Sequence, residues 1–108
     1  MSSEQMATDW HDALAADALA DGERRCVEVA GVRILIVEAD GCIHALSPEC
    51  THAGAALADG RVRGGDIICS RHGMRFGLAD GEPKGPLSRT PLTVYPCRER
   101  EGRIEVAL

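Results

Sequence analysis

The chain has 108 residues, of which 44% are hydrophobic, a size that suits one ordinary domain with a single core. Its 12 basic and 17 acidic residues give a formal net charge of -5, which argues against nucleic acid as a partner because phosphate binding needs a basic surface. No apolar run approaches the roughly 20 residues that a membrane-spanning helix needs, so we expect a cytoplasmic protein without membrane contact.

The first 20 residues carry little patterning. Residues 1–8 are polar and predict a flexible terminus, with order beginning near Trp10. The alanine-rich segment 12–20 has helical propensity but is too short for a stable isolated helix, and Asp21-Gly22 ends it. A single helical turn is the prediction for this segment.

From Arg24 onward, short apolar runs alternate with turn residues, which is typical of an antiparallel sheet protein. Asp40-Gly41 is a hairpin turn signal, and Gly64-Gly65, Asp80-Gly81 and Glu101-Gly102 mark further turns. The predicted strands are residues 26–30, 32–38, 42–46, 61–63, 66–69, 75–78, 92–97 and 103–106. The expected fold class is therefore all-β, a small antiparallel sandwich or barrel in one domain of residues 1–108.

The chain contains five cysteines, an odd number without the dense pairing of small secreted proteins. Thiols that serve a metal are therefore favoured over disulfides. Three of the five lie in apolar, strand-like contexts and are predicted to be buried core thiols, because free cysteine packs as a small hydrophobic residue. These three are Cys26, Cys42 and Cys97.

The other two cysteines belong to metal-ligand motifs, Cys50-Thr51-His52 and Cys69-Ser70-Arg71-His72, which sixteen residues separate. Thiolate favours zinc or iron-sulfur clusters, and imidazole suits both, so ligand type alone leaves two candidates. Structural zinc commonly takes two like ligands from each of two turns, whereas here each motif supplies one thiol and one imidazole. This order favours a two-iron cluster in which both cysteines hold one iron and both histidines hold the other.

On these motifs the sequence resembles the Rieske ferredoxins. The resemblance covers all four candidate ligands and extends from about Trp10 to Leu108; it includes Gly54, the turn Ala58-Asp59-Gly60, Gly73, Phe76, Gly81 and the proline-rich loop 83–86. It implies a Rieske-type fold with a cluster-binding subdomain at the tip and one 2Fe-2S cluster. Cys50 and Cys69 would then bind the inner iron and His52 and His72 the outer one, with the loop around Pro86 covering a third side.

The resemblance also indicates a subtype. High-potential members carry two further cysteines and a serine near the cluster, and this chain has Ala55, Arg71 and Met74 at about those positions. A missing hydrogen-bond donor lowers the potential of such a centre. The chain is therefore similar to the low-potential, soluble members.

The function that the resemblance implies is single-electron transfer, as a soluble monomer, from a flavin-dependent NAD(P)H reductase to a terminal oxygenase. We expect no catalysis of its own, because the chain lacks a Gly-x-Gly-x-x-Gly nucleotide loop and a nucleophile with a base. Two alternatives are a small subunit or accessory module of a larger reductase such as nitrite reductase, and a zinc-stabilised interaction module without a redox role.

Overall fold

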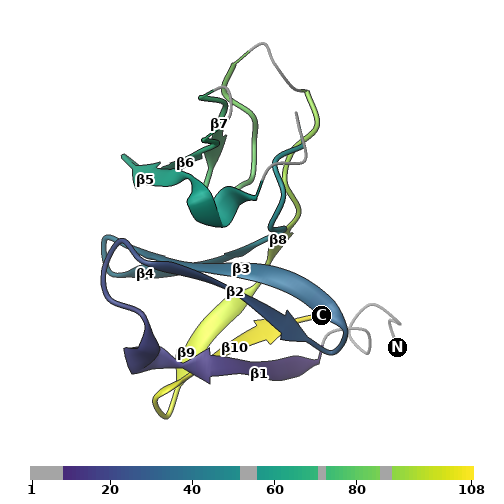
Figure 1. Ribbon diagram of the computed structural model, residues 1–108. Helices are drawn as coiled ribbons and strands as arrows, with labels where there is room; N and C mark the ends of the chain where they lie inside the picture. Colours follow the sequence, from purple (N-terminus) through teal and green to yellow (C-terminus); the bar gives the residue numbers. More distant parts are fainter. Residues whose placement is uncertain (1–8, 52–55, 71–72, 86–88) are drawn as a thin grey trace.

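The computed structural model of the chain describes residues 9–51, 56–70, 73–85 and 89–108 (Figure 1). Strands dominate these residues, which include no α-helix and no helix long and apolar enough to cross a bilayer. The strands are β1 (Trp10–Ala15), β2 (Arg24–Val29), β3 (Val32–Ala39), β4 (Cys42–Leu46), β5 (Arg61–Arg63), β6 (Asp66–Ile68), β7 (Arg75–Gly77), β8 (Val94–Tyr95), β9 (Cys97–Arg100) and β10 (Arg103–Ala107). Two 3₁₀ turns, η1 (Ala16–Ala18) and η2 (Leu57–Asp59), complete the elements, and the all-β prediction is confirmed.

The described strands form three antiparallel sheets, ordered β1-β10-β9, β2-β3-β4-β8 and β5-β6-β7. In Figure 1 the first two sheets pack against each other and the third stands at one end of the molecule. We call this end, made of η2, β5, β6 and β7, the tip subdomain. The resemblance to Rieske ferredoxins implies a cluster-binding subdomain at such a tip.

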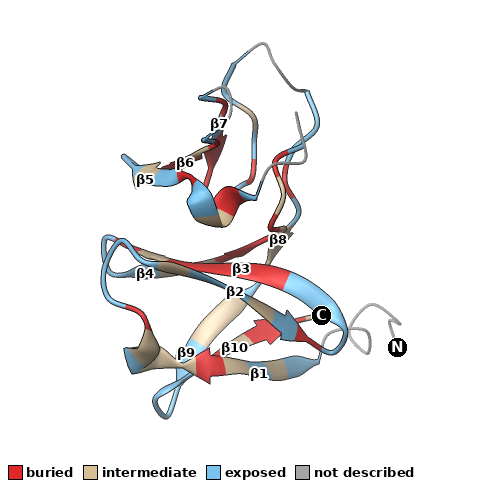
Figure 2. Ribbon diagram, in the orientation of Figure 1, coloured by how far each residue is buried: buried red, intermediate tan, exposed pale blue. Residues whose placement is uncertain are grey.

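Strand β3 holds the molecule together because it is buried on both faces. Ile34, Leu35, Ile36 and Val37 are each 0% exposed, and alternate side chains of a strand point to opposite sides (Figure 2). One core, between the two larger sheets, gathers Leu14, Leu19, Val29, Ile34, Ile36, Ala45, Ile104 and Val106. The other core joins the sheet of β3 to the tip subdomain; it includes Leu35, Val37, Leu57, Ile67, Met74 and Phe76. The tip subdomain is thus anchored on β3.

The predicted single helical turn near the start of the chain is present, but a strand that the sequence did not predict precedes it. Residues 10–15 form strand β1, and only Ala16–Ala18 form a helical turn. Strand β1 pairs with β10 from Trp10↔Ala107 to Ala15↔Arg103. Alanine-rich sequence favours a helix only weakly, and the backbone hydrogen bonds and buried Leu14 gained by this long-range pairing override that preference.

The predicted strand 92–97 is also corrected, because it divides between two sheets. Val94–Tyr95 pair with β4, whereas Cys97–Arg100 pair with β10. Pro96 stands between them and has no backbone N–H to continue a ladder, so the chain changes sheets there. Strand β2 also begins two residues earlier than predicted, at Arg24.

The prediction of three buried core thiols is wrong for Cys26 and Cys42, whereas Cys97 packs against the core between the larger sheets. Cys26 and Cys42 are exposed and Cys97 is half-buried. Cys26 shares the face of β2 that bears Glu28, and the side chain of Arg33 lies over it with Nη2 3.9 Å from the thiol. Cys42 is the first residue of β4, directly after the turn at Asp40-Gly41, and the burial of β4 begins only further along the strand.

Candidate metal centre

Cys50 and Cys69, the two thiols of the sequence motifs, are among the most buried residues of the chain. Cys50 is 2% exposed and Cys69 is 1% exposed. Both belong to the core that joins β3 to the tip subdomain, together with Leu57 and Met74. The structure therefore brings the two predicted thiols into one apolar cluster, although 19 positions separate them in the sequence.

The loop that begins at Cys50 is fastened on both sides of its base. Glu49 pairs with Ala56 in an isolated antiparallel bridge, and the amide of Leu57 donates to the carbonyl oxygen of Pro48 at 2.8 Å. Thr51 Oγ1 lies 2.7 Å from the carbonyl oxygen of Thr90 and donates a hydrogen bond to it. The residue that follows Cys50 is thus tied to a distant segment of the chain.

Cys69 opens the turn that joins β6 to β7. Its amide donates to the carbonyl oxygen of Met74 at 2.8 Å, and its own carbonyl accepts from the amide of Gly73 at 3.1 Å. Gly73 has a φ of 71°, a left-handed conformation that glycine adopts without strain. This closed turn fixes the backbone of Cys69 at the end of β6.

A third segment, Pro83 to Gly85, runs along β7. Pro83 pairs with Phe76 in an isolated bridge, and the amide of Lys84 donates to the carbonyl oxygen of Arg75 at 2.8 Å. A Cβ atom at Gly85 would lie 3.5 Å from Met74 Sδ, so this segment passes close to the buried methionine. The expected covering loop begins here, while Pro86 itself lies outside the described residues.

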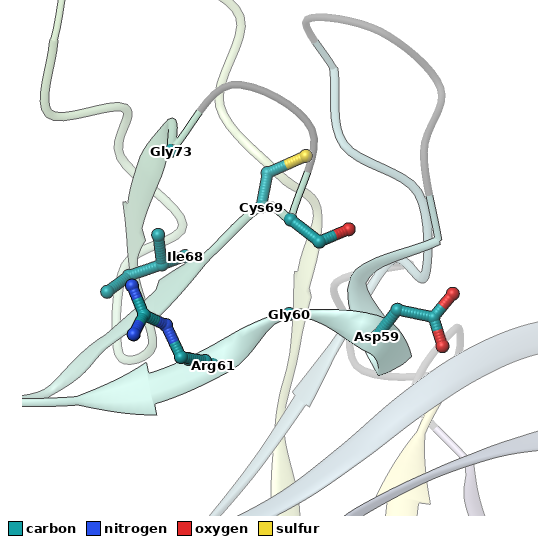
Figure 3. A pocket seen from close by; sticks show the side chains of 7 residues that line it. Asp59, Gly60, Arg61, Ile68, Cys69 and Gly73 are labelled. Carbon is teal, nitrogen blue, oxygen red and sulfur yellow. The ribbon is translucent and has the colours of Figure 1, made fainter.

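A pocket of about 420 Å³ lies beside Cys69, between the end of η2, the start of β5 and the β6–β7 turn (Figure 3). Its walls are Asp59, Gly60, Arg61, Ile68, Cys69, Ser70 and Gly73. Cys50 is not part of this wall. The pocket alone is therefore not a complete site for a group that both thiols hold.

Charge at the tip centres on Asp66, which is 8% exposed and is the buried charged residue of the described chain. Lys84 Nζ lies 2.6 Å from its Oδ1, and Arg75 Nε lies 3.4 Å from its Oδ2. One carboxylate thus links β6, β7 and the segment after β7, and two cations surround it. Nothing in the sequence motifs predicted this link or the hydrogen bond of Thr51.

The remaining predicted ligands, His52 and His72, lie outside the described residues, as do Ala55 and Arg71. The thiol half of the predicted donor set fits a two-iron cluster: two cysteines on separate, firmly closed loops are buried in one apolar cluster at the tip. Thiolates in such surroundings are the usual ligands of iron-sulfur clusters. The fold defines the class, a small antiparallel β protein, and the two thiols at its tip are suited to hold an iron-sulfur centre.

Comparison with known proteins identifies the family. Residues 9–96 match the Rieske 2Fe-2S domain, so the chain belongs to this family, and its cofactor is one Rieske 2Fe-2S cluster. The ferredoxin component of the naphthalene 1,2-dioxygenase/salicylate 5-hydroxylase systems of a Ralstonia species is 30% identical over 99 residues. That alignment covers 92% of this chain and 95% of the relative.

Solved structures agree with the family. A chain of the complex of reduced oxygenase and oxidised ferredoxin in carbazole 1,9a-dioxygenase superposes with a TM-score of 0.83 at 29% identity, covering 91% of this chain and 92% of the other. A Mycobacterium tuberculosis protein, described with reservation as the small subunit of an NADH-dependent nitrite reductase, gives a TM-score of 0.82 at 30% identity, covering 94% and 96%. Both similarities extend over nearly the whole chain.

Proposed function

We propose that the chain is a soluble Rieske ferredoxin that carries single electrons from a flavin-dependent NAD(P)H reductase to a terminal oxygenase. The observation that carries this proposal is the pair of buried thiols, Cys50 and Cys69, at the tip of a fold that matches ferredoxin components over nearly their full length. In this proposal Cys50 and Cys69 hold the inner iron, and His52 and His72 hold the outer one. Residues 1–108 act as one Rieske domain.

When bound, the cluster supplies a site that accepts and releases one electron, at a potential of about -150 to +300 mV because two neutral imidazoles replace two thiolates. The residues of the chain hold and insulate this site. The closed turn at Cys69 and the fastened loop at Cys50 fix the thiols, while Leu57 and Met74 exclude water from them. Ligands held this firmly move little when the charge changes, which favours rapid electron transfer.

The relatives support a role as an electron carrier rather than a catalyst, because they are ferredoxin components of dioxygenase systems. The chain binds no substrate of its own in this proposal; its partners are the reductase and the oxygenase, which it meets in turn as a monomer. The odd number of cysteines favours a reducing compartment, so we place the protein in the cytoplasm.

The test is reconstitution with separate partners. Purified protein should be a reddish-brown monomer that takes up one electron per chain from NADH through a ferredoxin reductase, and should pass it to the terminal oxygenase of a Rieske dioxygenase system. Colourless protein that contains zinc would overturn the cluster and support the interaction module. Coloured protein that no free reductase can reduce would overturn the carrier role.

A second candidate is the small subunit of a nitrite reductase, which the structural similarity to the Mycobacterium tuberculosis protein favours. A subunit of this kind would remain bound to a large catalytic chain. Gel filtration of the native cell extract separates the two functions: a carrier elutes near its own mass of 11.5 kDa, and a permanent subunit elutes with a much larger partner.

A further inference from the structure

Arg24, the first residue of β2, belongs to one of the two larger sheets but points toward the tip subdomain. It pairs with Val37 of β3, and directly opposed residues of an antiparallel pair lie on the same face of the sheet. Val37 is part of the core beneath the tip subdomain. The side chain of Arg24 therefore leaves its own sheet on the side where the tip subdomain sits.

The guanidinium of Arg24 binds two backbone carbonyls at the C-terminal end of the η2 turn. Its Nε donates to the carbonyl oxygen of Ala58 at 3.0 Å, and its Nη2 donates to the carbonyl oxygen of Gly60. These two carbonyls lie 34 and 36 positions from Arg24 in the sequence and flank Asp59. A planar guanidinium can hold two acceptors in a fixed geometry, which an ammonium cannot do.

Residues 56–60, which we call the bridging segment, contact both cysteine loops. At one end, Ala56 pairs with Glu49 and the amide of Leu57 donates to Pro48, so this end closes the loop of Cys50. At the other end, a Cβ atom at Gly60 would collide with the carbonyl oxygen of Ile68, the residue before Cys69. Figure 3 shows Gly60 next to the end of the strand that carries Ile68, where Cys69 follows.

We propose that Arg24 is a positioning residue that fixes the bridging segment on the larger sheet and thereby sets the spacing of Cys50 and Cys69. This inference rests on the proposed function, in which both thiols bind one iron. Two thiolates that share an iron must stay at one separation and orientation, because a loosened ligand exposes the metal to exchange and hydrolysis. The bridging segment is a direct physical link between the two loops, and Arg24 attaches it to the rest of the protein.

The test compares three variants of the cluster-loaded protein. Arg24→Met keeps an apolar stem without donors, and Arg24→Lys keeps the charge without the two-pronged geometry. Arg25→Met is the matched control: Arg25 is exposed, lies on the opposite face of the same strand, and its side chain forms no hydrogen bond or ion pair with the described part of the chain. The readouts are cluster loss to an iron chelator, the EPR spectrum of the reduced cluster, and hydrogen–deuterium exchange of peptides that cover residues 56–60 and 66–70.

We expect Arg24→Met to lose its cluster about tenfold faster, a change equivalent to about 1.4 kcal/mol of protection. Its EPR lines should broaden, exchange should accelerate in both peptides, Arg24→Lys should be intermediate, and Arg25→Met should match the wild type. The positioning role is overturned if Arg24→Met matches the wild type in all three readouts, or if Arg25→Met changes them equally. It is also overturned if cluster loss follows thermal stability alone while the EPR spectrum stays unchanged.

If Arg24→Met does not fold, Arg24→Lys provides the test. Rates of hydrogen–deuterium exchange and of cluster loss in Arg24→Lys that equal those of the wild type would overturn the positioning role. The wild-type spectra are recorded first and test the proposed function separately. Absence of a Rieske signal from the wild-type protein defeats the proposed function, whereas a normal wild-type signal with unaffected variants defeats only the role of Arg24.

Discussion

Lys84 places its ammonium 2.6 Å from Oδ1 of Asp66, and this contact joins the segment after β7 to strand β6. Arg75 approaches the other carboxylate oxygen at 3.4 Å. Asp66 begins strand β6, which ends one residue before Cys69, and Lys84 precedes Gly85, which packs on Met74. The ion pair therefore fastens two of the described segments that surround the buried thiols.

Replacing Asp66 by Asn should destabilise the tip, because two cations lose a partner that is largely shielded from water. Lys84 and Arg75 are themselves half exposed, so solvent limits the effect to about 1 to 2 kcal/mol. The thermal midpoint, followed by loss of visible absorption, should fall by roughly 4 to 8 °C per kcal/mol. Glu49→Gln, which breaks the exposed pair with Arg33, is the control and should leave the midpoint unchanged; equal midpoints for Asp66→Asn and the wild type would contradict the prediction.

The strands that the sequence predicts well are those with a strong local signal. Strand β3 is a run of branched apolar residues ahead of Asp40-Gly41, and both features act within a few residues. The strand β1 could not be predicted, because its partner β10 lies at the other end of the chain and outweighs the helical preference of alanine. The division at Pro96 carried a local signal, the missing N–H of proline, which the strand prediction overlooked.

The candidate site also has a part that the sequence predicts and a part that only the fold shows. Cys50 and Cys69 are evident from motif spacing, since ligand types and their order are properties of the sequence alone. Their supports are long-range contacts: Thr51 with Thr90, Asp66 with Lys84, and Arg24 with Ala58. An exposed arginine or threonine is common in any sequence, so only the folded chain shows which of them hold the site.

Cys50→Ser should yield colourless, poorly folded protein, because cluster binding is coupled to folding and serine is a weak substitute for thiolate. Visible absorption and iron content per chain measure the effect. Cys42→Ser is the matched control, since Cys42 is an exposed thiol at the end of a strand, and it should keep the wild-type spectrum. A normal spectrum in Cys50→Ser would contradict the ligand assignment.

Met74→Ser should raise the reduction potential by tens of millivolts if its side chain faces the cluster, because a hydroxyl would donate to a centre that becomes more negative on reduction. A shift of about 60 mV corresponds to about 1.4 kcal/mol for one electron, which is within the range of one hydrogen bond to a charged group. Met74 is 2% exposed, so the substitution also leaves a cavity. Met74→Ala makes a similar cavity without the donor, and the difference in potential between the two variants isolates the hydroxyl; no difference would contradict the prediction.

His44 should make stability depend on pH on the acid side. Burial lowers the pKa of His44 below its ordinary value of 6.5, and a hydrogen bond with the backbone of Leu78 offsets part of this shift. In the unfolded chain the imidazole takes up a proton as the pH falls through about 6.5, while in the folded chain it stays neutral until a lower pH is reached. The stability contribution is therefore complete above pH 6.5 and declines below it, by less than the limiting slope of about 1.4 kcal/mol per pH unit because the ring is partly solvated.

His44→Gln, which can still donate to Leu78 but does not titrate, should lose this decline. Unfolding measured in both proteins between about pH 7 and pH 5 removes the contribution of all other groups from the difference. A difference that stays constant across this range would contradict a lowered pKa of His44 in the folded chain.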